Sequence, residues 1–320
     1  MSEFVSKATR AGYGEAIAEL GAENENIVVL DADLAGSTQS GKIRTTRPDH
    51  FFNCGIAEAN MIGIAAGLSL SGFTVFASSF AMFASERAFE QVRNSIGYPH
   101  LNVKIAASHG GISVGEDGAS HQCCEDIALM RTIPGMTIIN PADWVEAKAA
   151  VKAAAAYEGP VYLRFGRLAV PQFYDADTFE FVWGKATTLR AGTDVAILAT
   201  GLMVPEAMTA AETLEEQGIS ARVVNITTIK PLDEETVLQA AGECGCVVTA
   251  EEHSIIGGLG GAVSELLSEK LPTPVLRVGV KDVFGRSGPA KELLHLYGLD
   301  AEAIAAAARE AVAFKKRLGR

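Results

Sequence analysis

The chain has 320 residues, of which 48% are hydrophobic and 21% charged, and its formal net charge is −12. This composition is that of an ordinary globular protein, long enough for a large core and two domains. The negative charge and the absence of a long basic run argue against nucleic acid as a partner, but they leave room for small phosphorylated substrates, which need only a few local cations.

The first half alternates helix and strand patterns, which is typical of an α/β fold with a mostly parallel sheet. The predicted helices and strands follow one another over residues 6–23, 26–34, 58–71, 73–78, 82–96, 101–107, 125–133, 136–140, 141–156 and 159–166. Residues 170–190 lack a helical period and predict a linker. The pattern then restarts over residues 194–201, 205–218, 221–226, 246–252, 257–269, 273–279 and 300–319.

One long apolar run stands out in the first half. Residues 51–85 contain a single charged side chain, Glu58. Residues 61–84 are long enough to span a bilayer, but their glycines and the central "SGF" favour a buried helix, a glycine stop and a buried strand. We therefore expect no membrane partner. A buried carboxylate is costly unless it is paired or functional, so Glu58 is a candidate for function.

Glycine and cysteine motifs indicate no second ligand site. "IIGGLGGAV" (255–263) follows a strand pattern, but its spacing differs from a dinucleotide fingerprint, and we expect tight strand–helix packing instead. The five cysteines show no paired metal-ligand spacing, and Cys244 and Cys246 read as small apolar residues leading into a strand. We expect no metal site in this chain. The odd cysteine count without a signal peptide predicts reduced thiols and a cytoplasmic location.

The most polar and glycine-rich stretch of the first half is "HGGISVGEDGASHQ", from His109 to Gln122. Histidines next to carboxylates on loops at strand ends are common reaction sites in α/β folds. Together with "GIAEANMIGIAAGLSLSG", "SFAMFASERAFEQVRNSI" and "EEHSIIGGLGGAV", this stretch resembles the C-terminal half of transketolase over nearly the whole chain. The resemblance implies two α/β domains: a pyrimidine-binding domain over residues 1–175 and a transketolase C-terminal domain over residues 190–320.

The resemblance gives Glu58 a role with thiamine diphosphate. The glutamate of "GIAEAN" would hydrogen-bond the aminopyrimidine ring and help to activate the cofactor, a role that suits a carboxylate in apolar surroundings. Phe80 and Phe83 would line the pyrimidine pocket, with Phe83 stacking on the ring. Asp33 and Leu34 match the segment that approaches the ring from a strand end.

The polar loop would face the substrate. His121 matches the histidine that contacts the donor carbonyl and hydroxyl during carbon–carbon cleavage, and Asp117 matches the aspartate that reads the adjacent hydroxyl. The resemblance assigns a sugar-phosphate grip to Arg10, Ser37, His109 and Arg167. Planar guanidinium groups suit a phosphate, although Arg164 stands close enough in sequence to replace Arg167.

Two departures from the family pattern are informative. The chain lacks the "GDG" segment and downstream Asn through which transketolases hold the diphosphate by a metal ion. It therefore resembles the smaller subunit of a split transketolase. A separate N-terminal subunit would bind Mg²⁺ or Ca²⁺, in an assembly of two copies of each chain. In addition, Glu86 stands where full-length members usually carry a pocket tyrosine, which puts cofactor contacts there in doubt.

The implied activity is transfer of a two-carbon ketol unit from a ketose phosphate to an aldose phosphate. Three alternatives remain open. A 2-oxo acid dehydrogenase β subunit has a similar length and also needs a partner, but generally lacks the "GEDGASHQ" arrangement. A deoxyxylulose phosphate synthase is usually a single longer chain. A partner subunit without catalytic activity is the third alternative.

Overall fold

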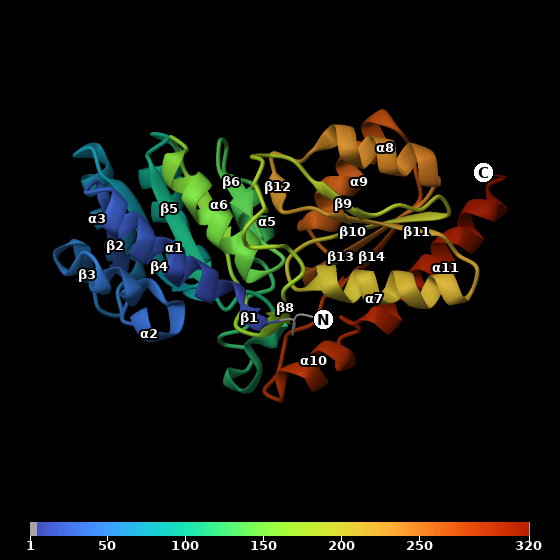
Figure 1. Cartoon of the computed structure of the whole chain (residues 1–320), viewed down its shortest axis with the longest axis horizontal. Helices are drawn as coiled ribbons and strands as arrows, with labels where there is room; N and C mark the ends of the chain where they lie inside the picture. Colours follow the sequence, from blue (N-terminus) through green and yellow to red (C-terminus); the bar gives the residue numbers. More distant parts are fainter. Residues whose placement is uncertain (1–4, 320) are drawn as a thin grey trace.

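The computed structural model describes residues 5–319, and its architecture is two β-sheets with helices on both faces (Figure 1). A small third sheet pairs two short strands from distant parts of the sequence, β1 (Ser6–Ala8) and β8 (Ala169–Pro171). The arrangement confirms the predicted α/β fold with mostly parallel sheets. Among residues 5–319, no helix has the length and apolar character needed to cross a bilayer.

The first sheet has seven strands, and all of its pairings are parallel except that of the edge strand β12. In spatial order the strands are β12 (Thr228–Lys230), β6 (Thr137–Ile139), β7 (Val161–Arg164), β5 (Val103–Ser108), β4 (Thr74–Phe80), β2 (Ile27–Asp31) and β3 (Phe51–Asn53). Successive side chains of a strand point to opposite faces. Val29 therefore packs with one helical layer and Leu30 with the other, which explains the continuous apolar run of β2.

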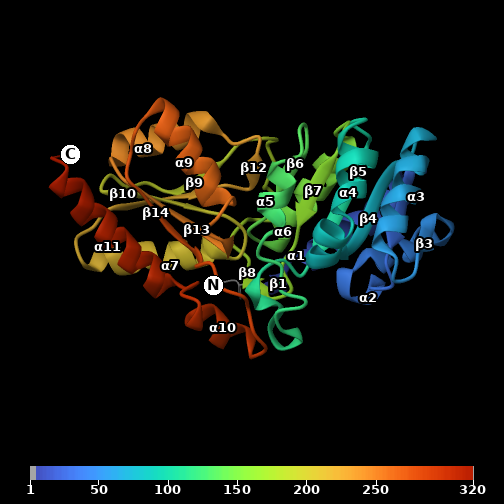
Figure 2. The ribbon, with the colours of Figure 1, turned by 180° about the vertical axis from the view of Figure 1, so that it is seen from behind.

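Helices cover both faces of the first sheet (Figures 1 and 2). One face packs against α1 (Thr9–Glu23) and α6 (Trp144–Ala156), which also contact each other. The opposite face carries α3 (Glu58–Leu70), α4 (Phe89–Gln91) and α5 (Asp126–Arg131). Short α2 (Ala35–Thr38) and the 3₁₀ segments η1 (Ser40–Thr45), η2 (Pro48–His50) and η5 (Ile112–Asp117) form the loops beyond the strands.

The second sheet has five strands and the same three-layer arrangement. In spatial order its strands are β14 (Val275–Val280), β13 (Val247–Ser254), β10 (Val195–Ala199), β11 (Ala221–Asn225) and the antiparallel edge strand β9 (Thr187–Arg190). Its helices are α7 (Met203–Glu216), α8 (Glu234–Cys244), α9 (Leu259–Lys270), α10 (Ala290–Leu296) and α11 (Ala301–Arg317). Helices α7 and α11 cover one face, and α8 and α9 cover the other (Figure 1).

The apolar run forms a helix and a strand as predicted, but the helix is buried on one face only. Met61 and Ala65 of α3 are fully buried, whereas Ile64 is 40% exposed and Leu70 is 76% exposed. The strand β4 that follows is almost entirely buried. The expectation of a buried helix is therefore wrong for the outer face of α3, which no other element among residues 5–319 covers.

The amphipathic segment after β4 is helical, but it is not one regular helix. It consists of η3 (Met82–Arg87) and η4 (Val92–Gly97), both wide helical turns of π type, joined by α4. The charged residues of this segment do lie on the exposed side, as predicted. Because π turns hold an extra residue each and often occur at functional sites, this irregularity draws attention to Phe83 and Glu86 within η3.

The glycine-rich motif after β13 is used for packing, as expected. Both oxygens of Glu251 accept hydrogen bonds from the first turn of α9, at the backbone nitrogens of Leu259 (2.7 Å) and Gly260 (2.8 Å). A Cβ atom on Gly258 would lie 2.0 Å from Glu251 Oε2. The helix N-terminus is thus already satisfied by a carboxylate of its own chain, in the position where a dinucleotide phosphate would otherwise bind.

Candidate active site

The candidate site lies at the carboxyl edge of the first sheet. Neighbouring parallel strands β2, β4 and β5 end at Asp31, Phe80 and Ser108, and His109 follows directly. Carboxyl ends of parallel strands meet at one edge, and this edge is where α/β proteins usually bind ligands. The local fold therefore gathers residues that are far apart in the sequence.

Two phenylalanines and two histidines form one contact cluster at this edge. The Phe80 ring stacks on His109 with centroids 3.8 Å apart, and on Phe83 with centroids 6.0 Å apart. The His121 ring lies edge-on to Phe83 at 5.3 Å. These four residues all came from the sequence comparison with one family, and the fold brings them into contact.

Glu58 connects to this cluster through an arginine that the sequence analysis missed. Glu58 is the first residue of α3 and is 2% exposed. Its Oε2 lies 3.6 Å from Nη1 of Arg87, whose guanidinium carbon lies 5.1 Å from the centroid of the Phe83 ring. The sequence offers one indication for Arg87, which is the first cationic residue after the apolar run over residues 51–85.

One oxygen of Glu58 is left without a hydrogen bond. Oε2 is buried and has no hydrogen-bond partner among the described residues, so its contact with Arg87 is an ion pair at longer range. A buried carboxylate oxygen in this state is costly for the fold. An N–H group on a bound ligand would satisfy it.

Two side-chain contacts fix the ring orientation of His109. Its Nδ1 lies 2.8 Å from Ser108 Oγ, and its Nε2 lies 3.4 Å from Arg10 Nη1. Because arginine only donates, Nε2 is the acceptor and Nδ1–H donates to Ser108. Burial, followed by the charges of Arg10, Arg167 and His121, lowers the pKa of His109 to about 3. The ring is therefore a neutral acceptor at physiological pH.

We expect histidine NMR to show that His109 stays neutral down to about pH 4. The reference pKa of histidine is 6.5 and that of folded His109 is about 3. Between these two pH values the unfolded chain binds a proton at this histidine and the folded chain does not. The contribution of His109 to stability is thus complete above pH 6.5 and is lost as the pH falls towards 3. Exposed His295, whose pKa is raised by its hydrogen bond to Asp300, is the internal control. A resonance assigned through His109→Gln that titrates near pH 6.5 would contradict the buried neutral ring.

Two arginines converge near His109. Nη1 of Arg10 donates to the carbonyl of Ser37 at 2.6 Å. Arg167 donates to the carbonyl of Val114 and, at 2.9 Å, to Glu116 Oε2. Burial and the charge of Arg167 lower the pKa of Arg10. An anion bound between or beside two such cations reduces the electrostatic repulsion between them.

Arg164 is committed to a different task. It is 3% exposed and donates through Nε to Asp126 Oδ2 at 2.8 Å. Its Nη2 donates to the carbonyls of Cys123 (3.2 Å) and Glu252 (3.0 Å). Arg164 is therefore a buried structural cation, and of the two arginines considered from the sequence only Arg167 is near Arg10 and partly exposed.

The remaining predicted residues lie on loops around the cluster. Asp31 accepts the Leu34 backbone N–H at 2.5 Å and two hydroxyl hydrogen bonds, which shape the turn that presents Ser37. Asp33 is exposed, has a φ of 68°, and accepts from Asn53. Asp117 is exposed at the end of η5. The structure shows no side-chain contact that joins Asp33 or Asp117 to the aromatic cluster within residues 5–319.

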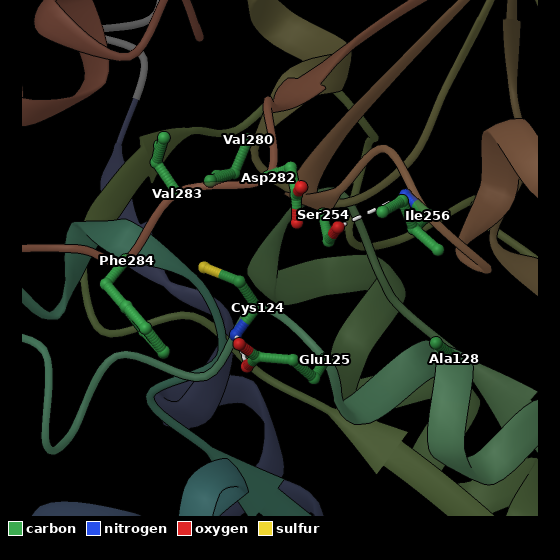
Figure 3. Close-up of a pocket in the computed structure, with 9 residues that line it drawn as sticks. All are labelled: Cys124, Glu125, Ala128, Ser254, Ile256, Val280, Asp282, Val283 and Phe284. Atoms are coloured by element: carbon green, nitrogen blue, oxygen red, sulfur yellow. Dashed lines mark hydrogen bonds between the residues drawn. The ribbon is translucent and has the colours of Figure 1, made fainter.

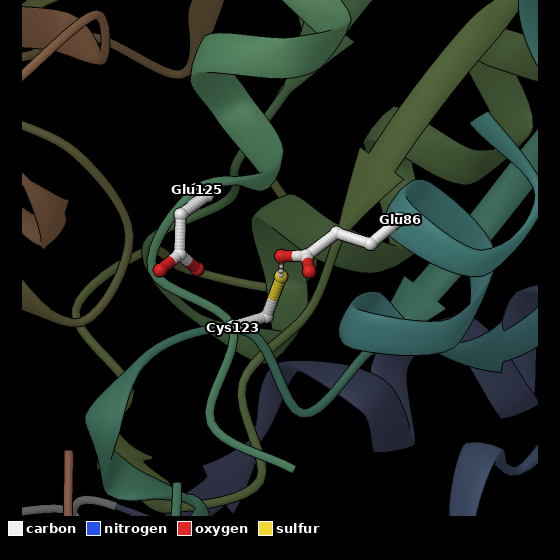
Figure 4. A group of neighbouring side chains, drawn as sticks. All are labelled: Glu86, Cys123 and Glu125. Atoms are coloured by element: carbon white, nitrogen blue, oxygen red, sulfur yellow. Dashed lines mark hydrogen bonds between the residues drawn. The ribbon is translucent and has the colours of Figure 1, made fainter. Parts of the chain in front are cut away.

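Glu86 points toward Cys123 and Glu125, as Figure 4 shows. The three ligand-type atoms lie within 4.8 Å of one another, the one such cluster among residues 5–319. Cys123 donates to Glu86 Oε1 at 3.5 Å. Burial and the nearby acids raise the pKa of the Cys123 thiol well above its usual value. The arrangement gives Glu86 a thiol–carboxylate contact within the first half of the chain.

A pocket of about 360 Å³ lies between the two halves of the chain (Figure 3). It is lined by Cys124, Glu125, Ala128, Ser254, Ile256, Val280, Asp282, Val283 and Phe284. It contains none of the predicted site residues. The aromatic cluster and Glu58 are therefore arranged on an edge of the first sheet and not within this pocket.

Comparisons with known proteins agree on one family. Residues 5–172 match the family model "Transketolase, pyrimidine binding domain", and residues 184–304 match "Transketolase, C-terminal domain". The chain is 55% identical to a putative transketolase C-terminal section of Methanocaldococcus jannaschii, over 94% of this chain and 95% of that protein. It is 46% identical to a 6-deoxy-6-sulfo-D-fructose transketolase subunit of Clostridium sp., over 94% and 93% of the two chains.

A solved structure of a split-gene transketolase, described as an inactive beta4 tetramer, has the same fold. Its sequence is 52% identical, the TM-score is 0.90, and the match covers 97% of this chain and 99% of that chain. The similarity therefore extends over both halves of the molecule.

Proposed function

This chain belongs to the transketolase family, and from that premise we propose that it is one subunit of a two-chain, thiamine diphosphate-dependent transketolase. The enzyme moves a two-carbon ketol unit from a ketose phosphate to an aldose phosphate. The observation that carries the proposal is the unsatisfied buried oxygen of Glu58, linked through Arg87 to the cluster of Phe80, Phe83 and two histidines.

The residues fit the pyrimidine end of the cofactor. When bound, thiamine diphosphate supplies the carbon nucleophile and the electron sink that a ketol cleavage requires. Glu58 would hydrogen-bond the pyrimidine ring, donate a proton to it and recover that proton, a role supported by the burial of Oε2 and by its lack of a hydrogen bond among the described residues. Phe80 and Phe83 would line the pyrimidine pocket, with Phe83 stacking on the ring, and Asp33 and Leu34 would border the cofactor from the end of β2.

The polar loop over residues 109–122 and the two arginines would bind the sugar phosphate. His121 would contact the donor carbonyl and hydroxyl groups, and Asp117 would contact the adjacent hydroxyl. Arg10, Ser37, His109 and Arg167 would hold the phosphate, and this anion would relieve the mutual repulsion of the two guanidinium groups. A sulfonate is also a tetrahedral anion, so the sulfo sugar named for the Clostridium relative suits the same pair.

We propose that the diphosphate and its Mg²⁺ or Ca²⁺ ion are held by a separate N-terminal subunit. We propose an α2β2 assembly, in which a neighbouring chain covers the exposed apolar face of α3. A split-gene relative whose beta4 tetramer is described as inactive supports the need for a further chain. All five cysteines are free, which suits the proposed cytoplasmic location. Pentose phosphates are the default substrates.

Purification of the tagged chain from its native lysate with thiamine diphosphate and Mg²⁺ tests the proposal. Mass spectrometry should identify a second chain that carries "GDG" and a downstream Asn. The complex should transfer a two-carbon unit between pentose phosphates, or from a sulfo sugar, whereas the chain alone should not. Recovery of a lipoyl-bearing acyltransferase instead would indicate a 2-oxo acid dehydrogenase. A complex that binds cofactor without turnover on any of these substrates would indicate a non-catalytic subunit.

We predict that Arg10→Gln and Arg167→Gln each raise the KM for a phosphorylated donor by about 10–100-fold, because each removes a charge-assisted hydrogen bond. The KM for the same ketose without its phosphate should change little. Arg190→Gln, which breaks a surface pair with Glu215 in the second sheet, is the matched control. An equal effect on both donors would mean that the two arginines do not bind the phosphate.

A further inference from the structure

The histidine loop of the first half is held in place by the second half of the chain. Residues 109–122 carry His109, Asp117 and His121, and η5 within them packs against α10. Figure 3 shows the chain around Val280–Phe284 running beside the segment of Cys124 and Glu125 that follows the loop. The proposed catalytic groups therefore lie on a loop that packs against the C-terminal domain.

Glu252, near the end of β13, anchors the first part of this loop. It is buried, and its Oε1 accepts the backbone N–H of Ser113 at 2.6 Å across 139 residues of sequence. Gly111 makes the approach possible, since a Cβ atom there would lie 2.3 Å from Glu252 Cδ. Gly111 also has a φ of 91°, which disfavours other residues.

Gln122 anchors the other end of the loop. It directly follows His121 and is 4% exposed. Its amide nitrogen donates to the carbonyls of Ile112 and Arg286, both at 3.0 Å, so one side chain joins the two ends of the loop to the C-terminal domain. The chain around Arg286 passes so close that a Cβ atom on Gly285 would lie 1.8 Å from Gln122 Oε1.

Two glycines of the loop also allow close contact with the C-terminal domain. A Cβ atom on Gly118 would lie 2.4 Å from Ser287 Oγ, and one on Gly115 would lie 3.3 Å from the carbonyl of Gly288. Both glycines have positive φ values, 76° and 84°. Gly115 and Gly118 are thus required by close contact with Ser287 and Gly288 and by the loop's own conformation.

We propose that Gln122 and Glu252 are positioning residues for His121 and His109. Through them, the C-terminal domain holds the histidine loop in the conformation that binds substrate. Neither side chain reacts. Gln122 fixes the backbone next to His121, and Glu252 fixes the strand-end turn after His109. This inference deepens the proposed function and rests on it for its catalytic meaning, but the loop anchoring stands on the structure of this chain.

Hydrogen exchange on the full-length chain tests the anchoring without any assay of activity. Gln122→Met keeps the size of the side chain but removes its donor, and Glu252→Leu removes the acceptor. Each should increase exchange by at least about tenfold within residues 110–122, because a lost anchor lets the loop open locally. Exchange in β4, β5 and β10 should not change. Gln239→Met on exposed α8 is the matched control.

Kinetics of the assembled two-chain enzyme test the positioning. Gln122→Met and Glu252→Leu should lower kcat by about 10–100-fold, because small displacements of catalytic groups cost this much, with no more than about a threefold change in the Kd for thiamine diphosphate. Glu252→Gln keeps a carbonyl oxygen for the Ser113 N–H and should recover most of kcat.

The outcomes separate the two proposals. Exchange that is unchanged in the loop, or raised throughout the chain, overturns the anchoring. Faster loop exchange with normal kcat overturns the positioning role. If the wild-type complex shows no ketol transfer, the proposed function fails, while the exchange result still decides whether the C-terminal domain holds the loop.

Discussion

Replacing Glu58 by Gln is expected to lower the turnover of the assembled enzyme by about 10²–10⁴-fold, the usual contribution of a positioned acid–base group. Gln has nearly the same shape as Glu, so α3 and its packing should be kept. Its amide cannot take up and return a proton. The Kd for thiamine diphosphate, measured by calorimetry on the complex, should change far less than kcat.

Glu90→Gln is the matched control for this experiment. Glu90 lies on the exposed side of the neighbouring α4, where it contacts Gln91 and Asn94 and no predicted site residue. The control should retain normal turnover and assembly. Full turnover of the Glu58→Gln complex would remove Glu58 from the mechanism, and with it the observation on which the proposed function depends.

Replacing Arg164 by Met should lower the free energy of unfolding of the chain by about 3–5 kcal/mol, the usual cost of leaving a buried charge without its partner. Asp126 is fully buried, and burial alone would raise its pKa. The charges of Arg164 and His253 and the hydrogen bonds from Arg164 and Tyr162 together hold the pKa of Asp126 below its usual value. Removing the guanidinium also frees the carbonyls of Cys123 and Glu252. Urea unfolding of the isolated chain measures the change.

Two further variants make the result specific. Arg190→Met breaks the partly exposed pair with Glu215 and should cost less than about 1 kcal/mol. The double variant Arg164→Met with Asp126→Leu should recover part of the loss, since no buried charge remains. A cost below 1 kcal/mol for Arg164→Met alone would show that this arginine is not a structural cation, and would reopen it as a phosphate ligand.

Long apolar strands and capped helices were predictable because their signals are local. Strand β2 is an apolar run that ends at an Asp, and β4 is an uncharged, almost entirely buried strand. Helix α11 begins after an Asp whose side chain accepts from the third residue of the helix. Three-residue strands such as β12 carry no such signal. No local pattern predicts the π-type turns η3 and η4 either.

The candidate site could be predicted only where motifs of one family stood in the sequence. Phe80, Phe83, His109 and His121 were predicted in this way, and the fold brings their rings into contact. Arg87, Gln122 and Glu252 were not predicted, because their contacts depend on partners set by the tertiary fold. The Ser113–Glu252 hydrogen bond, across 139 residues, is one that no local pattern encodes.

The edge strand β12 has a consequence for how the chain can be divided. Residues Thr228–Lys230 lie between strands of the second sheet in sequence, yet they complete the first sheet beside β6. A fragment that ends in the linker would leave β6 as an open edge, which invites self-association. A chimaera in which two relatives exchange C-terminal domains would likewise exchange this strand, so the compatibility of the donor with β6 becomes a condition for solubility.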